Sequence, residues 1–542
     1  MMLTNNNFLK LRLVLFILKG NCLAFAAGKI TLGRFFFALR KQIIIASNFS
    51  GAKYTKIREK IFIDPFAPYF PSRSFLKVLE NNSHDRLPLK PNYAQISITN
   101  RCPCRCFHCH VKNTQDKNDL NRERIVQAVE DIAKQDFPLI FFVGGEPMER
   151  FSDLLDFIKT AAQQDLDTRI FTSGVGVTPE RLTQLKSAGL HGICISIDHH
   201  VEAEHNRLRR HPQAFASACK AVQEARAQDF YVSIVCCVRS PYVASGEFEK
   251  MVLLAEELGA HSIQLNEIRP VGRARDSQDE SFSLCREDKE TLIRYYHREN
   301  SSARKIAIVM PWYNEEPDKF GCTATSGQTA YIDSYGNVQP CQLVKVRLGN
   351  INQKRFAEIW QGFLPNFSHP VRDCLVYPVN EILTAKQQEF IAEDAVMQHW
   401  PDLCQQETTD MFKRFKVKPT VPQTEQEPTA EDLAEKYNLT LQEGHDFHLL
   451  AGHWLPMKLN VPYIALGNKL YCQSEGSEIP RHEFLHIAQF DKYGFSGVIS
   501  HYLRHMLVNY IHCRNAGEAF RNIPFEQEAR LFEQQGKGRT FL

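Results

Sequence analysis

The sequence lacks an apolar run long enough to cross a membrane. A transmembrane helix needs about 20 consecutive apolar residues, whereas the early run LVLFIL, at 13–18, ends at Lys19. The tripeptide AFA at 24–26 imitates a signal-peptidase site, but the apolar stretch before it is short and interrupted. We therefore expect a cytoplasmic protein rather than a secreted or membrane-spanning one.

Acidic residues are almost absent from the first 60 positions, which hold a single acid, Glu59, against eleven lysines and arginines. Combined with the apolar stretch FLKLRLVLFILKG (8–20), this charge favours peripheral contact with an anionic membrane surface. The alternative is a solvated basic face on helices that pack against the rest of the chain. No nucleic-acid partner is expected.

The cysteines do not form the spread pattern of a disulfide framework. Of the sixteen cysteines, four lie within ten positions, RCPCRCFHCH at 101–110. Disulfide frameworks are typical of small secreted domains, whereas 542 residues allow roughly two to four domains with cores of their own. Such a cluster in a long chain favours a metal or catalytic site.

Short apolar runs alternate with amphipathic helical stretches through the first half of the chain. The predicted strands are 94–98, 139–143, 168–172, 192–197, 231–235 and 262–266. This rhythm predicts an α/β fold, a parallel sheet with helices outside, and six such units fit a partial (β/α)6 barrel. Right-handed crossovers place the carboxyl ends of all strands on one rim, where barrel chemistry occurs.

The cysteine cluster follows the first predicted strand. Cys102, Cys106 and Cys109 have the spacing C-x3-C-x2-C, and three thiolates on one tight loop can hold three irons of a [4Fe-4S] cluster. The fourth iron is then open to a ligand. A four-cysteine zinc site would need a second cysteine pair nearby. We interpret Cys104 as a bystander, with a part in the chemistry or in the substrate pocket as the alternative. We expect His108 to shield or tune the cluster.

Short motifs with polar side chains or glycines lie at the ends of the next three predicted strands: GGEP (144–147), TSG (172–174) and SID (196–198). Paired glycines allow a ligand to approach the backbone closely, and a carboxylate suits an ammonium group. Hydroxyl and carboxylate groups suit a ribose. The candidate cofactor-binding residues are Gly144, Gly145, Glu146, Pro147, Ser173, Ser196 and Asp198.

Together, C-x3-C-x2-C, GGEP and SIDHHVEAEHNRLRRHPQAF (196–215) resemble the radical S-adenosylmethionine (SAM) superfamily over about residues 90–275, especially members that modify peptides and proteins. The resemblance implies that the open iron chelates SAM, whose amino group Glu146 would hold. It implies reductive cleavage of SAM to a 5′-deoxyadenosyl radical, which abstracts a hydrogen from the substrate. An electron donor such as a flavodoxin or ferredoxin is the implied partner.

A second cysteine-bearing stretch, from about 306 to 404, resembles the SPASM/twitch subgroup of that superfamily. The resemblance implies an auxiliary iron–sulfur cluster held by Cys322, Cys341 and Cys374, with Cys404 as a candidate fourth ligand. The alternative is a small β-hairpin domain with free cysteines.

A third site is predicted near the end of the chain, in HEFLH at 482–486. On a helix, His482 and His486 share one face and can bind one zinc ion, while Glu483 can activate the metal-bound water as general base. The stretch resembles HExxH zinc metallopeptidases, with Glu526 as third ligand and Glu528 as the alternative.

The predicted organisation has five parts: a basic, apolar helical region (1–88), a radical SAM barrel (89–300), a small α+β auxiliary-cluster region (301–404), a linker (405–432) and a mainly helical zincin-like domain (433–542). One hypothesis is a radical enzyme acting on a peptide or protein, with a zinc domain that cleaves peptides. The other is a radical enzyme acting on a small molecule or lipid at a membrane surface, with a non-catalytic zinc-stabilised binding module.

Overall fold

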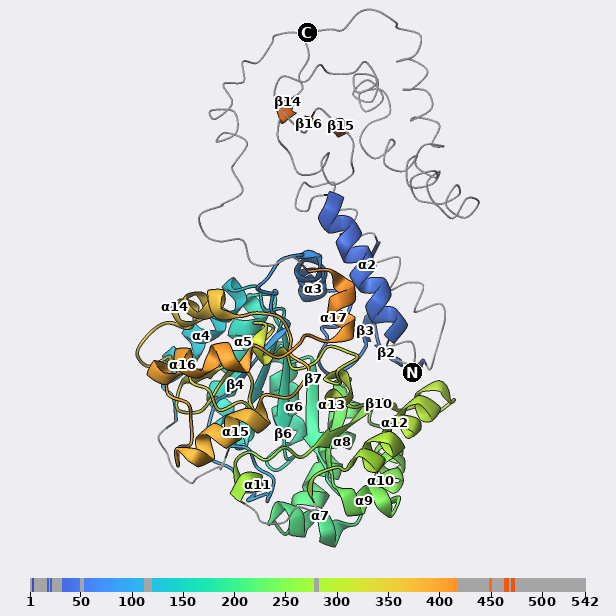
Figure 1. The fold of residues 1–542 in the computed structure, drawn as a ribbon. Coiled ribbons are helices and arrows are strands. Elements are labelled where there is room, and N and C mark those ends of the chain that lie inside the picture. Colours follow the sequence, from blue (N-terminus) through green and yellow to red (C-terminus); the bar gives the residue numbers. More distant parts are fainter. Residues whose placement is uncertain are drawn as a thin grey trace, which may run out of the picture. The chain divides into compact units, whose positions relative to one another are not determined.

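The computed structural model describes residues 2–3, 17–18, 20–21, 32–48, 53–111, 119–276, 282–417, 448–450, 463–466 and 469–472. The chain forms two compact units. The first comprises Met1–Ala24 and Arg34–Thr420, and the second comprises Phe25–Gly33 and Val421–Leu542. In the first unit, helices surround a central sheet (Figure 1).

The central sheet has ten strands in the order β10-β9-β8-β7-β6-β5-β4-β11-β12-β13. The strands from β4 to β11 pair in parallel, and only β12 and β13 pair antiparallel. All six predicted strands are present, which confirms the partial barrel. The strand bounds are β4 (Tyr93–Ser97), β5 (Leu139–Val143), β6 (Asp167–Thr172), β7 (Gly192–Ser196), β8 (Tyr231–Val238), β9 (Ser262–Glu267), β10 (Ala307–Val309), β11 (Thr329–Ile332), β12 (Asn337–Gln339) and β13 (Gly349–Asn350).

Helices follow the strands in the predicted alternation. In the helix after β6, Thr178 caps the amino end by accepting a hydrogen bond from Arg181, and Gly189, at φ 108°, ends it. The helices between β4 and β10 are α4 (Arg122–Lys134), η1 (Pro147–Arg150), α5 (Phe151–Gln163), α6 (Pro179–Ala188), α7 (Glu202–Arg209), α8 (Ala214–Ala227), α9 (Ser240–Ala244), α10 (Glu247–Glu257), α11 (Arg273–Asp276) and α12 (Arg286–Ser301).

The parallel strands are buried on both faces, as their continuous apolar runs predict. In β5, Phe142 packs outward on Phe157 of α5, while its neighbour Phe141 packs inward with Phe171 and Tyr93. Alternate side chains therefore build the outer core and the lining of the barrel interior.

The segment before β4 covers the amino ends of the strands. The guanidinium of Arg169 in β6 is fully buried and donates to the backbone carbonyls of Asp64 and Ala67. This N-terminal region was predicted to be helical, yet β1 (Met2–Leu3), β2 (Tyr54–Ile57) and β3 (Lys60–Phe62) form a small sheet there. Its helices are α2 (Leu32–Asn48) and α3 (Arg73–Ser83).

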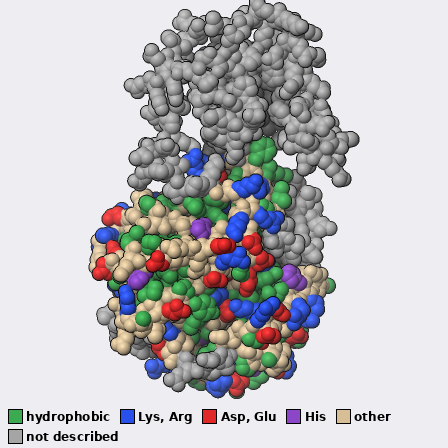
Figure 2. Space-filling model, viewed as in Figure 1, with side chains coloured by type: hydrophobic (Ala, Val, Ile, Leu, Met, Phe, Trp, Pro, Cys, Tyr) green, Lys and Arg blue, Asp and Glu red, His purple; other side chains and the backbone are tan. Residues whose placement is uncertain are grey.

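Figure 2 shows basic and acidic side chains interspersed over the visible face of the first unit, with apolar and basic side chains together on α2. Phe36 and Ile43 of α2 are 43% and 69% exposed. None of the helices in the described part of the chain is long and apolar enough to span a membrane.

The region after β10 extends the barrel sheet, because β11 pairs in parallel with β4. The predicted hairpin at 331–341 is present as β11 and β12. Residues 410–415, inside the predicted linker, form a helix whose Met411, Phe412 and Phe415 are buried. The helices of this region are α13 (Pro311–Asn314), η3 (Thr323–Thr325), α14 (Phe356–Phe363), η4 (Leu364–Asn366), α15 (Val376–Ala385), α16 (Glu393–Leu403) and α17 (Asp410–Phe415).

In the second unit, the described residues form a three-stranded sheet. β16 (Lys469–Cys472) lies between β14 (His448–Leu450), which is parallel to it, and β15 (Tyr463–Leu466), which is antiparallel. The predicted zinc site falls outside the described residues and stays a prediction; it comprises His482, Glu483, His486, Glu526 and Glu528.

Candidate active site on the barrel rim

The cysteine loop, residues 101–110, lies at the carboxyl end of β4. Cys102, Cys104 and Cys106 are buried, Cys109 is half-buried, and the four pack together as free thiols. GGEP, TSG and SID follow β5, β6 and β7 on the same rim. The structure therefore brings the predicted motifs together at one edge of the barrel.

The two glycines of GGEP make room for the chain itself. A Cβ on Gly145 would lie 2.0 Å from the carbonyl oxygen of Arg101, and one on Gly144 would lie 2.6 Å from that of Thr99. The amides of Gly145 and Glu146 donate to these same two carbonyls at 2.7 Å. The glycines thus hold the start of the cysteine loop against β5, a role that the sequence did not indicate.

Two arginines hold the cysteine loop from the other side. Nη1 of Arg209 lies 3.6 Å from Sγ of Cys106, and the carbonyl of Arg209 accepts a hydrogen bond from the amide of Arg105 at 3.0 Å. Arg273 donates its backbone amide to the carbonyl of Cys109 at 3.0 Å and its guanidinium to that of Cys106 at 3.1 Å. Arg209 lies within the stretch 196–215, but nothing in the sequence indicated its role.

Cys104 packs within the cluster formed by the four cysteines of this loop. Its side chain is hydrogen-bonded to those of Cys102 and Cys106, and these bonds raise its pKa. The hydrogen bond from Cys104 lowers the pKa of Cys106, against burial, and the charges of Arg209 and His108 add to the effect. A thiolate is the form that binds metal, so the position of Cys106 suits a ligand.

Glu146 is fully buried, and its carboxylate accepts four hydrogen bonds. Oε1 accepts from the Thr172 hydroxyl at 2.7 Å and from the Met148 amide at 3.1 Å, and Oε2 accepts from the amide and hydroxyl of Ser173 at 2.7 and 2.6 Å. Burial raises the pKa of Glu146 despite these bonds. A carboxylate has about four lone-pair sites, so a ligand ammonium would have to replace or share one of these donors.

Asp198 is also buried and is paired within the protein. Its Oδ2 lies 2.7 Å from Nε of Arg209 and 3.7 Å from Nε2 of His108, and its Oδ1 accepts from the Cys237 amide at 3.0 Å. Burial alone would raise the pKa of Asp198, but the positive charge of Arg209, with smaller electrostatic contributions from His108 and His205, holds it below its usual value. Asp198 therefore fixes Arg209 beside Cys106, and its predicted contact with a ribose stays a prediction.

The second set of cysteines is brought together around the end of the sheet. The thiol of Cys322 is hydrogen-bonded to that of Cys374, which lowers the pKa of Cys374, and Cys341 lies within electrostatic reach of Cys374. The predicted fourth ligand, Cys404, ends α16, where its thiol contacts Ser368.

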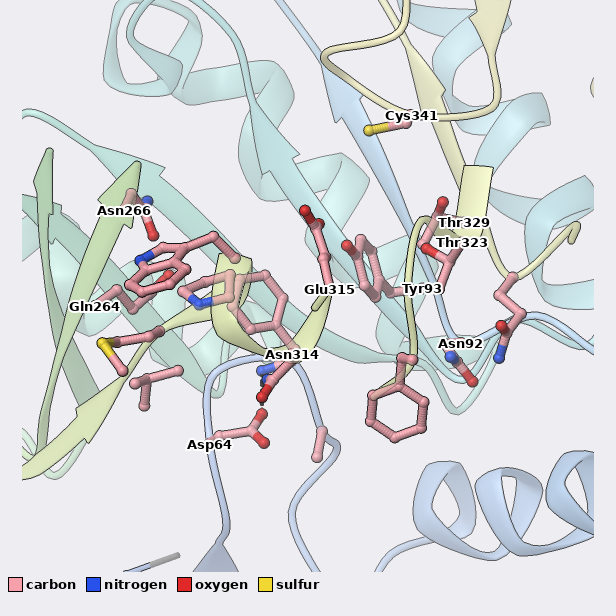
Figure 3. Close-up of a pocket in the computed structure, with 18 of the residues that line it drawn as sticks. Asp64, Asn92, Tyr93, Gln264, Asn266, Asn314, Glu315, Thr323, Thr329 and Cys341 are labelled. Carbon is pink, nitrogen blue, oxygen red and sulfur yellow. Dashed lines mark hydrogen bonds between the residues drawn. The ribbon is translucent and has the colours of Figure 1, made fainter. Parts of the chain in front are cut away.

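A cavity of about 570 Å³ is lined by residues from both cysteine-bearing segments. His108 and His110 of the cysteine loop and Cys341 of the second set all line it. Figure 3 shows Glu315 and Tyr93 projecting into its middle, with Cys341 beyond Glu315. Burial lowers the pKa of His110 to about 3, so this imidazole is a neutral part of the wall.

Comparison with known proteins agrees with the geometry. Residues 96–255 match the radical SAM superfamily, and residues 322–368 match SPASM, an iron–sulfur cluster-binding domain. The chain contains a radical SAM domain and a SPASM domain. A radical SAM domain uses a [4Fe-4S] cluster and SAM, and a SPASM domain binds an auxiliary iron–sulfur cluster. The buried free thiols of both sites fit such clusters, because thiolates are their usual ligands.

The proteins similar to the radical SAM and SPASM region include enzymes described by different activities. The chain is 25% identical over 296 residues to the AdoMet-dependent heme synthase of Methanosarcina barkeri, covering 50% of this chain and 82% of that protein. It is 26% identical over 282 residues to the PqqA peptide cyclase of Gluconobacter oxydans, covering 51% and 77%. The crystal structure of Streptococcus suis SuiB bound to S-adenosylmethionine aligns with 53% of this chain and 70% of that chain, at 14% identity and a TM-score of 0.41.

Proposed function

We propose that this radical SAM enzyme abstracts a hydrogen atom from a substrate held inside the barrel. The observation that carries the proposal is the single cavity lined by both the cysteine loop and Cys341. When bound, the reduced cluster and SAM supply a 5′-deoxyadenosyl radical. The protein contributes the walls, which keep water and other radical acceptors away.

Cys102, Cys106 and Cys109 are the ligands that we assign to the SAM-binding cluster, with Arg209 and Arg273 holding their loop. Cys322, Cys341 and Cys374 are those that we assign to the auxiliary cluster. Our candidates for contacts with SAM lie at the ends of three successive strands: Glu146, Ser173 and Ser196. The same edge is shaped by Gly144, Gly145 and Pro147. Asp198 acts there through its ion pair with Arg209. The electron donor would be a flavodoxin or ferredoxin.

The geometry favours a small organic molecule as the substrate. Apart from Glu315, whose side chain is 45% accessible, every lining residue is buried or half-buried. The volume of this cavity is within the range of ordinary small-molecule sites. The similarity to heme synthases is consistent with this choice.

A peptide or protein is the second candidate substrate, supported by the similarity to PqqA peptide cyclase. A peptide could reach the interior cavity with one side chain while its backbone stays outside. The amide side chains of Gln264, Asn266 and Asn314 line the cavity and offer hydrogen bonds to either class of substrate.

A deuterium-transfer experiment tests the function and separates the two substrates. Cells are grown in heavy water, and their extract is divided into small-molecule and peptide fractions. Each fraction is incubated with the anaerobically reconstituted, reduced enzyme and SAM, and deuterium in 5′-deoxyadenosine is measured by mass spectrometry. We expect transfer from the small-molecule fraction. Transfer from the peptide fraction alone would reverse the choice, and 5′-deoxyadenosine that never acquires deuterium would count against hydrogen abstraction.

For the C-terminal part we propose a zinc site held by His482, His486 and Glu526, with Glu483 as general base of a peptidase. The support is the sequence motif HEFLH. We expect the full chain to bind one zinc ion and to cleave a generic peptide, and Glu483→Gln to keep the zinc but lose cleavage. Zinc binding without cleavage in the parent protein would favour a zinc-stabilised binding module. Absence of zinc from His482→Ala and the parent alike would reject the site.

We also propose that the basic N-terminal region makes peripheral contact with anionic membranes. Phe36, Arg40 and Ile43 are exposed on α2 at helical spacing. Co-sedimentation with anionic vesicles, compared with neutral ones, measures this contact.

A further inference from the structure

Lys41 of α2 lines the cavity with an unusual lack of partners. The residue is only 5% exposed. Its Nζ lies over two aromatic rings, 5.5 Å from the ring centroid of Phe415 and 6.0 Å from that of Phe37. Among the described residues, no carboxylate or carbonyl accepts a hydrogen bond from this ammonium group.

The other two cations that line the cavity, Lys53 and Arg269, are paired. Lys53 is as deeply buried, but its Nζ donates to the backbone carbonyls of Glu299, Arg304 and Ile306 at 2.7, 2.9 and 3.3 Å. Arg269 is paired with Glu267 at 2.8 Å and with Glu315 at 3.4 Å. Lys41 is therefore the cation of this cavity that the described part of the protein leaves uncompensated.

An unpaired buried ammonium is costly, because burial removes its hydration and no opposite charge replaces it. Burial lowers the pKa of Lys41 to about 8. A counter-charge brought by a bound molecule would recover the lost interaction. The surroundings also limit what that molecule can be, since Lys41 lies beside a cluster of apolar side chains: Ile44, Ile45, Leu89, Phe320, Phe412 and Phe415.

We propose that Lys41 binds the carboxylate of the substrate, and that the substrate is an amphiphilic monocarboxylic acid. Its apolar body would lie along the aromatic wall, and the carbon that loses hydrogen would lie toward the cysteine loop. One ammonium balances one carboxylate, whereas a phosphate dianion would need more donors than a single lysine supplies. The choice of substrate class rests on the proposed function, but the binding site can be tested without turnover.

Dodecanoate is a suitable probe, with dodecyltrimethylammonium as the oppositely charged control. We expect calorimetry to show one dodecanoate bound per full-length chain and much weaker binding of the cationic probe. Lys41→Met keeps the length and apolar character of the side chain but removes its charge. It should weaken dodecanoate binding by about 10- to 100-fold, the range for a hydrogen bond to a charged group. Lys41→Arg should restore binding, and Lys220→Met, on the exposed face of α8, should leave it unchanged.

A stability measurement guards against a purely structural role. Without ligand, Lys41→Met should melt at a higher temperature than the parent, because an apolar group replaces an unpaired buried charge. Equal dodecanoate affinity in Lys41→Met and the parent would overturn the proposal. So would a lower melting temperature of Lys41→Met, because Lys41 would then have a structural partner. If the parent forms no 5′-deoxyadenosine while dodecanoate binding still depends on Lys41, the proposed function fails and the subsite stands.

Discussion

Replacement of Cys106 by serine is expected to reduce 5′-deoxyadenosine formation to the level seen without protein. Cys106 is buried among the cysteines of the loop on the barrel rim, and its environment favours the thiolate. Without this ligand the loop keeps too few thiolates to hold the cluster that reduces SAM. The measurement is 5′-deoxyadenosine by liquid chromatography, together with iron and sulfide content, on anaerobically reconstituted full-length protein.

Two cysteines serve as controls for this result. Cys285 is exposed at the amino end of α12, where serine can take over its capping role, so Cys285→Ser should behave as the parent. Cys104→Ser tests the ligand assignment itself, because Cys104 lies between two assigned ligands and contacts both. We expect Cys104→Ser to keep an intact cluster. Loss of the cluster in Cys104→Ser together with its retention in Cys106→Ser would contradict the C-x3-C-x2-C assignment.

Among the substitutions proposed for this protein, Arg209→Met is expected to lower the free energy of unfolding the most. The substitution leaves the carboxylate of Asp198 buried without its main counter-charge, 2.7 Å away in the parent protein. Breaking a buried ion pair from one side costs about 3–5 kcal/mol. Denaturant unfolding of the full chain measures this loss. The electron paramagnetic resonance signal of the reduced cluster should also change, because Arg209 contacts Cys106.

The neighbouring Arg207 is the matched control. It lies on the same helix, is exposed, and pairs with Glu204 at 2.8 Å, so Arg207→Met should change stability little. The double variant Asp198→Asn with Arg209→Met should recover part of the loss, since the buried charge is then gone. If Arg209→Met is as stable as Arg207→Met and its cluster signal is unaltered, then Arg209 does not hold the loop through Asp198.

Much of the barrel could be predicted from local sequence. The apolar run of β5, LIFFV, is buried along its whole length, as expected for a parallel strand covered on both sides. The Thr178 cap and the Gly189 end of α6 follow equally local rules. The cysteine loop was recognisable because one tight loop carries all its candidate ligands, so spacing alone carries the signal.

Contacts between distant segments were not predictable in this way. The pairing of β11 with β4 joins residues more than 200 positions apart, and nothing in either strand specifies the other. GGEP was interpreted as a ligand-binding turn, which stays a prediction, and only the folded protein shows that its glycines also accommodate the backbone of residues 99–101. The helix at 410–415 was missed because the polar, Pro-bearing composition around it is typical of a linker, while its apolar residues find a core only in the folded protein.

The sequence by itself determined the kind of chemistry in this protein, because ligand spacing and strand-end motifs are local properties of the chain. Only the tertiary structure decided which groups surround that chemistry. Arg209 reaches Cys106 because α7 packs beside the cysteine loop. Lys41 lines the cavity because α2 packs against Phe415 of α17, which lies more than 350 positions later in the chain. Burial, and therefore the need for a counter-charge, is a property of packing that no single segment carries.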